Sequence, residues 1–283
     1  MAVPRTDAGR VRRWKTDSVM LSAVTAQLDK IWRAALLPVL IVVIWSGITE
    51  GGLVSSYLLP SPTVVLAAAW DFIVGGGSNQ AYSGTFIVHF LASLRRVLGG
   101  FCLGAAAGVP LGIVLGYNRR VARFIEPTLL LTRSIPGICW LPLALIWFGI
   151  GTPASIFLIF LGSFYAILIA TVQGVKYVDP ILIRAARSLG ASERQLLHTV
   201  ILPAAFPSIL SGLRIGIAYS WIYMVLGEFT GVNLGLGATL LQSRETLNTE
   251  LTMALMIIIG VLGVLTDWPL LLIMRKIFRM DVR

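Results

Sequence analysis

Residues 97–117, VLGGFCLGAAAGVPLGIVLGY, form an apolar stretch that carries no charge. About 20 such residues are enough to cross the hydrocarbon core of a bilayer as a helix. Glycine recurs at every fourth position of this stretch, which places one stripe of small residues along the helix: Gly100, Gly104, Gly108, Gly112 and Gly116. Because small residues let the backbone of a second helix approach closely, we predict a membrane span that packs through this stripe.

The rest of the chain has the same apolar character. Of the 283 residues, 57% are hydrophobic and only 13% are charged, and the mean hydropathy is +0.85, values that are not typical of a soluble domain. We therefore predict an all-α, polytopic membrane protein with six transmembrane helices. They are placed near residues 34–53, 97–117, 128–150, 154–175, 208–230 and 251–273.

Proline and glycine mark where these helices bend or stop. Between the first two spans, Ser61–Pro62 and the glycines at 75–77 bracket a helix that is too short to cross the membrane. Pro110 lies inside the second span, and Pro136 and Pro142 lie inside the third. We expect kinks or local unwinding at these three prolines.

The distribution of positive charge predicts the orientation. Eighteen of the 23 Lys and Arg residues fall in segments on the same side as the N-terminus, whereas three, Arg95, Arg96 and Arg244, fall on the other side. By the positive-inside rule, both termini are cytoplasmic. The net charge of +10 then reflects basic loops at a membrane surface rather than a nucleic-acid partner. Residues 1–33 form a basic tail, and residues 34–283 form the transmembrane domain.

No pattern in the sequence indicates catalysis. Cys102 and Cys139 lack the spacing of a metal site or redox pair and are expected to be buried at membrane depth. His89 and His198 are isolated, and no G-x-x-x-x-G-K-[ST] phosphate-binding loop is present. We expect a protein that is not an enzyme and that holds neither a metal nor a cofactor of its own.

The loop at residues 176–207 is longer than a connection between adjacent spans requires. Asp179–Pro180 predicts the start of a helix and Gly190 its end. Ser192, with Gln195 three residues later, predicts a capping box for a second helix that ends before Pro203. We expect two short helices on the cytoplasmic face.

This loop resembles the EAA loop of the permeases of ATP-binding-cassette importers. The segment RAARSLGASERQLLHTVILPAAFPSILSGLR, residues 184–214, follows the family pattern of Glu-Ala-Ala, three residues, Gly, nine residues, Ile, one residue and Leu-Pro. Arg184 replaces the Glu of that pattern, and Val200 stands at the Ile position. The remaining positions match: Ala185, Ala186, Gly190, Leu202 and Pro203.

Other segments resemble the nitrate, sulfonate, taurine and bicarbonate branch of this family. They are LPSPTVVL at 59–66, RSIPGICWLPLALIWFGIG at 133–151, GLRIGIAYSW at 212–221 and GEF at 227–229. The resemblance implies the type I importer permease fold, a place in the bacterial inner membrane and a small oxyanion as cargo. Arg133 and Arg214, near the inner ends of predicted spans, are candidate contacts for that anion.

The resemblance also implies partners. Two permease copies, expected to be identical, form the pathway, and each inserts its loop into a cytoplasmic ATPase that binds ATP and Mg. A periplasmic or lipid-anchored binding protein delivers the substrate. Two alternatives stay open: the same importer carrying a small heterocyclic vitamin precursor, and a secondary transporter, against which the absence of an obvious internal repeat counts.

Overall fold

A computed structural model describes residues 36–76 and 81–278, and the regular secondary structure in these ranges is entirely helical. The predicted basic tail, residues 1–33, lies outside the described residues. The described residues fall into two compact units, divided between residues 64 and 65. The labelled helices are α2 (Pro62–Val74), α3 (Phe86–Tyr117), α4 (Arg119–Ser134), η1 (Gly137–Trp140), α5 (Leu141–Phe148), α6 (Thr152–Lys176), α7 (Pro180–Ser188), α8 (Glu193–Gln195), η2 (Leu196–Ile201), α9 (Leu202–Glu228), α10 (Leu236–Glu245) and α11 (Thr249–Phe278).

The first unit contains the apolar helix Leu36–Glu50. The Trp45 indole N–H donates to the carbonyl of Pro60 at 3.0 Å, so the chain after the helix folds back along it. The short helix predicted after Ser61 is confirmed as α2, which begins at Pro62 and straddles the boundary between the units. It ends at Val74, and the next residue, Gly75, has a φ of 78°, which suits a residue without Cβ.

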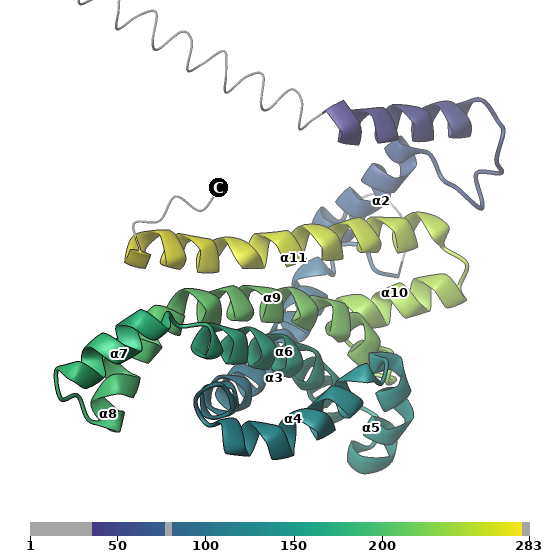
Figure 1. Cartoon of the computed structure of the whole chain (residues 1–283). Coiled ribbons are helices and arrows are strands. Elements are labelled where there is room, and N and C mark those ends of the chain that lie inside the picture. The colour runs from purple at the N-terminus through teal and green to yellow at the C-terminus, as the bar shows by residue number, and fades with distance from the viewer. Residues whose placement is uncertain (1–35, 77–80, 279–283) are drawn as a thin grey trace, which may run out of the picture. The chain divides into compact units, whose positions relative to one another are not determined.

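In the second unit, α3 and α9 each pack along the full length of α6, which places α6 at the centre of the bundle. α11 lies beside α9, and α10 joins the two (Figure 1). Apolar side chains from α3, α6, α9 and α11 form the largest core cluster, which includes Val97, Ile159, Met224 and Leu255. The buried faces of these helices meet one another, while large apolar side chains cover their outer faces.

The glycine stripe of α3 lies against α6. A Cβ atom added at Gly112 would lie 2.6 Å from the Cβ atom of Thr171, and one added at Gly116 would lie 2.6 Å from that of Val175. Gly100, Gly104 and Gly108 face α6 with similarly little space. The two helices are therefore in near backbone contact over five successive turns, as small residues permit.

The third predicted span is wrong as a single helix. α4 ends at Ser134, the chain turns at Ile135–Pro136, and the following pair of helices, Gly137–Phe148, leaves at 93° to α4. Pro136 accounts for the break, since it lacks an N–H and restricts the residue before it. Pro110 lies inside α3 without ending it, and Pro142 occupies the first turn of α5.

Within the part of the chain that the structure describes, four helices are long and apolar enough to cross a membrane, and the bent pair α4 with η1–α5 is a fifth candidate. The four spans are Phe86–Tyr117, Thr152–Lys176, Glu193–Glu228 and Thr249–Pro269. The second span thus begins well before the predicted residue 97, and it takes Arg95 and Arg96 into the helix. The helix described within the first predicted span, Leu36–Glu50, is too short to count among these spans, so a count of six stays a prediction.

Candidate coupling loop and translocation cavity

The caps predicted for the loop at residues 176–207 are confirmed. The Asp179 carboxylate accepts the Ile181 N–H at 2.8 Å at the start of α7. Gly190 has a φ of 80°, the left-handed conformation that glycine tolerates best. Ser192 and Gln195 form the capping box that opens α8. Local sequence therefore determines both helix starts and the turn between them.

The predicted end of the second loop helix is wrong. α8 passes into a π-helical turn, η2, which continues directly into α9, so one helical segment runs from Glu193 to Glu228. Pro203 lies in the first turn of α9. The change of hydrogen-bond register in the π turn accommodates the N–H that proline lacks, so the proline does not end the helix.

One face of α7 packs on the bundle and the other is exposed. Ile183 and Ala186 pack against a cluster that includes Leu196 and Ile201. Arg184, Ala185 and Gly190 are exposed. The remaining pattern positions, Val200 and Leu202, are half-buried, and Pro203 is exposed. Large apolar side chains also point outward from this loop: Tyr177, Ile181, Leu182 and Leu189. The loop thus presents an apolar surface with basic residues.

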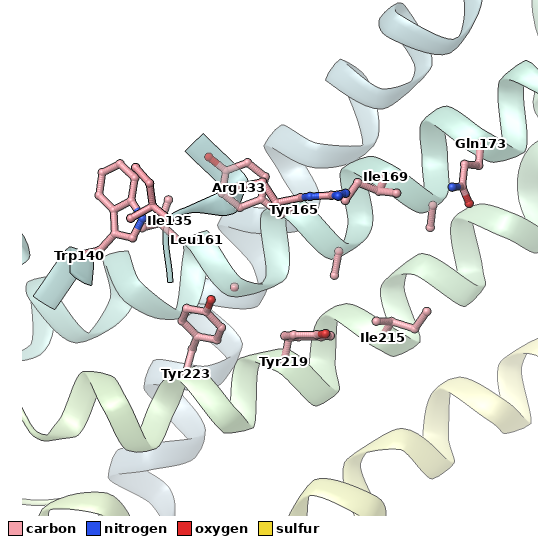
Figure 2. A pocket seen from close by; sticks show the side chains of 13 residues that line it. Arg133, Ile135, Trp140, Leu161, Tyr165, Ile169, Gln173, Ile215, Tyr219 and Tyr223 are labelled. Carbon is pink, nitrogen blue, oxygen red and sulfur yellow. The ribbon is translucent and has the colours of Figure 1, made fainter. Parts of the chain in front are cut away.

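A cavity of about 460 Å³ lies between the α4–η1 turn, α6 and α9 (Figure 2). Its polar lining consists of Arg133, Gln173 and three tyrosines, Tyr165, Tyr219 and Tyr223. Tyr219 and Tyr223 are one helical turn apart on α9 and point into the space below α6, and Arg133 reaches over α6 toward Ile169. The wall therefore combines one cation with neutral hydrogen-bonding groups.

A second cavity of about 270 Å³ lies between α3, α4 and α6. It shares with the first cavity four lining residues, Arg133, Tyr165, Ile169 and Gln173, and it extends toward the end of α6 at Lys176. Glu126 also lines it, 3.9 Å from the Lys176 ammonium. Arg133 thus borders both spaces.

Arg214, the other predicted anion contact, lines neither of these cavities. Its guanidinium donates two hydrogen bonds of 2.6 Å to the Asp267 carboxylate, which joins α9 to α11. The structure therefore does not bring Arg133 and Arg214 together. The positive charge of Arg214 is already balanced by a carboxylate, as expected for a structural pair between membrane helices.

Sequence analysis missed a polar network near the start of α3. Arg96, placed by prediction in an outer loop, is buried and lies 2.7 Å from the fully buried Glu228 carboxylate of α9. That carboxylate also accepts from the Ser93 hydroxyl and the Gly237 N–H, both at 2.7 Å. Ser93 and Arg96 continue the register of the glycine stripe toward the N-terminus, a signal that the sequence did contain.

The cysteines and His89 also differ from prediction. Cys102 and Cys139 are exposed in the single chain, so the prediction of burial is wrong; the face of a membrane helix is apolar whether it meets protein or lipid. His89 is not isolated, since its ring Nδ1 lies 3.0 Å from the Thr239 hydroxyl. Within the described ranges, no group of three His, Cys, Asp or Glu side chains is arranged to hold a metal.

Several apolar spans, a central helix trio and a capped helical loop at one end define a polytopic α-helical membrane protein. Residues 108–279 match the family of inner membrane components of binding-protein-dependent transport systems, and this chain belongs to that family. It is a multi-pass membrane permease subunit.

Two relatives show the branch. The taurine transport system permease protein of Escherichia coli is 36% identical, over 83% of this chain and 84% of its own length. The nitrate import permease protein of Synechocystis is 32% identical, over 84% and 86% of the two chains. Among solved structures, the MetNI methionine ABC transporter in inward-facing conformations matches with a TM-score of 0.60 and 23% identity, over 66% of this chain and 94% of that chain. This match shows the importer permease fold.

Proposed function

We propose that this chain forms the membrane pathway of an importer for a small oxyanion, such as a sulfonate or nitrate. The observation that carries the proposal is Arg133 on the wall of the 460 Å³ cavity. Among the residues that the structure describes, no carboxylate lies within ion-pair distance of its guanidinium. An available arginine in a cavity between membrane helices favours an anionic cargo.

The remaining polar groups of the cavity suit the same cargo. A guanidinium can donate two parallel hydrogen bonds to an oxyanion. The Gln173 amide and the hydroxyls of Tyr219 and Tyr223 add neutral donors. Neutral donors bind an anion less strongly than a second cation would. Weaker binding lets the anion leave the site, as transport requires. The relatives that transport taurine and nitrate both have cargoes with a charged oxygen-bearing group, a sulfonate or a nitrate.

The partners follow from the loop. An ATPase subunit that binds ATP and Mg would receive the exposed face of α7 in a groove, with Ile181, Leu182 and Leu189 as apolar contacts. A second, identical copy of this chain would complete the pathway, and a binding protein would deliver the cargo from outside. Closure of the ATPase pair would then move the loops and switch the spans between two discrete states.

Orientation can be tested by labelling single cysteines in intact cells. In a background that lacks the exposed Cys102 and Cys139, we expect Arg120→Cys and Arg187→Cys to react only from the cytoplasmic side. Glu245→Cys, at the end of α10, should react from outside. Labelling of Arg187→Cys by an impermeant reagent outside the cell would invert the proposed topology.

The cargo can be tested with purified complexes in proteoliposomes. Removing the charge in Arg133→Gln should lower kcat/KM for oxyanion uptake about tenfold or more, since hydrogen bonds from charged groups contribute about 1.5–3 kcal/mol. Arg123→Gln is the matched control, because Arg123 is exposed on the same helix and lines neither cavity. Equal uptake by both variants and wild type would remove Arg133 from the pathway.

Calorimetry of the cognate binding protein addresses the alternative cargo. We expect tight binding of a sulfonate, nitrate or bicarbonate ion. Tight binding of a neutral pyrimidine or flavin compound, with no response to any oxyanion, would support the vitamin-precursor alternative instead. ATP-independent uptake driven by an ion gradient would support a secondary transporter.

A further inference from the structure

The loop at residues 176–207 contains two carboxylates, Asp179 and Glu193. Asp179 caps α7 and is thereby accounted for. Glu193 is the first residue of α8, and its contacts extend beyond its own helix. Arg184 takes the place of the Glu in the family pattern, so Glu193 is the loop carboxylate left to make polar contacts between helices.

The two oxygens of Glu193 bind two different helices. Oε1 accepts a hydrogen bond from Arg187 Nη2 of α7 at 3.1 Å. Oε2 accepts a hydrogen bond from the Tyr117 hydroxyl, and Tyr117 is the last residue of α3. One side chain thus links the loop helix α7, the helix α8 and the membrane helix α3.

This polar link lies next to the last close contact between α3 and α6. Gly116, the neighbour of Tyr117, is the last member of the glycine stripe and faces Val175 of α6 without room for a Cβ atom. Because α3 and α6 are in near backbone contact, a displacement of Tyr117 moves both helices together. Glu193 itself begins the helical segment that continues into α9. A pull on Glu193 therefore also reaches two further spans, α3 and α6, and α6 lines both cavities.

The same link adds little to folding stability. The side chains of Arg187 and Glu193 are 58% and 64% exposed, and exposed ion pairs typically contribute less than about 1 kcal/mol. The inner face of α7 is held independently by apolar packing through Ile183 and Ala186. The function of the link is therefore separable from folding by experiment.

We propose that Glu193 is a positioning residue that transmits movement of α7 to the cytoplasmic end of α3 through Tyr117. The inference rests on the proposed docking of an ATPase to α7. When the ATPase moves α7, the two bonds of Glu193 carry the movement to α3. Without them, α7 moves about the turn at Gly190 while α3 lags.

The test measures ATP hydrolysed per substrate transported by the complete complex, with its ATPase and binding protein, in proteoliposomes. Tyr117→Phe and Glu193→Ala should each raise this ratio about two- to fivefold, the range that an exposed charged hydrogen bond can account for. The double variant should be no worse than Glu193→Ala alone, because Glu193→Ala already removes the bond that Tyr117→Phe removes. Glu193→Gln, which keeps an acceptor for Tyr117, should recover part of the coupling.

Arg194→Gln is the matched control, since it removes a charge from the adjacent exposed position. Unchanged ratios in both single variants, or additive effects in the double variant, would overturn the proposal. Gly190→Glu separates this result from the wider proposal. If Gly190→Glu leaves uptake intact, the ATPase-docking function of the loop fails; if it abolishes uptake while the Glu193 variants resemble wild type, only the positioning function of Glu193 fails.

Discussion

α3 is bound by a glutamate near each end, and the two differ in their surroundings. Glu228 binds Ser93 and Arg96 in the first turns of the helix and has 0% exposure. Glu193 binds Tyr117 at the last residue and is largely exposed. A buried carboxylate with every contact satisfied holds one geometry, because any shift leaves a charge without a partner. An exposed one can exchange its bonds for water and adapt. The difference suggests one fixed end and one adjustable end.

The fixed end is built with little tolerance. Arg96 donates to the Leu234 carbonyl at 2.6 Å as well as to Glu228, so it ties the segment before α10 to α3. A Cβ atom at Gly235 would collide with the Glu228 carboxylate. Gly235 also has a φ of 148°, so both the lack of space and the backbone conformation require glycine there. The positions of Arg96, Glu228 and the segment before α10 are thus fixed by one another's hydrogen bonds.

The largest effect is expected at the fixed end. Glu228→Ala leaves the Arg96 guanidinium buried without its counter-charge, and we expect a loss of about 3–5 kcal/mol of stability. Thermal unfolding of the purified permease in detergent measures it. Glu193→Ala serves as the comparison and should cost less than about 1 kcal/mol. If Glu228→Ala and Glu193→Ala lost equal stability, the two ends of α3 would not differ in rigidity as described.

The second-largest effect is expected at the contact between α3 and α6, which lies between the two ends of α3. Gly112→Ala puts a Cβ atom 2.6 Å from Thr171 Cβ, and such overpacking costs about 1–3 kcal/mol. Gly99→Ala is the matched control, because its nearest neighbour would lie at an ordinary 3.6 Å. Unfolding of both variants under the same conditions gives the comparison. If Gly99→Ala proved as harmful as Gly112→Ala, close approach of α6 would not be the cause.

A smaller effect than at the fixed end is expected at a third ion pair, of intermediate exposure. The side chains of Arg214 and Asp267 are 31% and 24% exposed. We expect Arg214→Gln to cost about 1 kcal/mol, between the values for the two ends of α3. Restoration of the melting temperature by the exchanged pair Arg214→Asp with Asp267→Arg would identify the pair as structural. Reduced oxyanion affinity with unchanged stability would instead return Arg214 to the pathway.

The features predicted well from sequence are those that depend on neighbouring residues. The glycine stripe predicted a closely packed face, and the α3–α6 contact has that geometry. The caps at Asp179 and Ser192 were predicted from three- or four-residue patterns. Each of these features is determined within one or two turns of helix, where periodicity and capping chemistry act.

The features that were missed depend on residues far apart in the sequence. Arg96 and Glu228 are separated by 132 positions, and hydropathy treats each charge as a cost without registering that they compensate one another. Because hydropathy counts a charge as a cost, the predicted second span began after Arg96. Pro136 predicted a kink, but a local pattern contains neither the 93° angle of the bend nor the contact of α5 with α6 that follows it.

The glycine stripe also constrains how the chain is made. α3 emerges from the ribosome before α6, with α4 and α5 between them. Until Thr171 and Val175 have been synthesised, the bare backbone along Gly112 and Gly116 has no protein surface to cover it. During that interval the stripe must face lipid or the insertion machinery. A nascent chain arrested shortly after α5 would therefore expose a surface attractive to the small-residue faces of other helices, and release of the arrest would bury it.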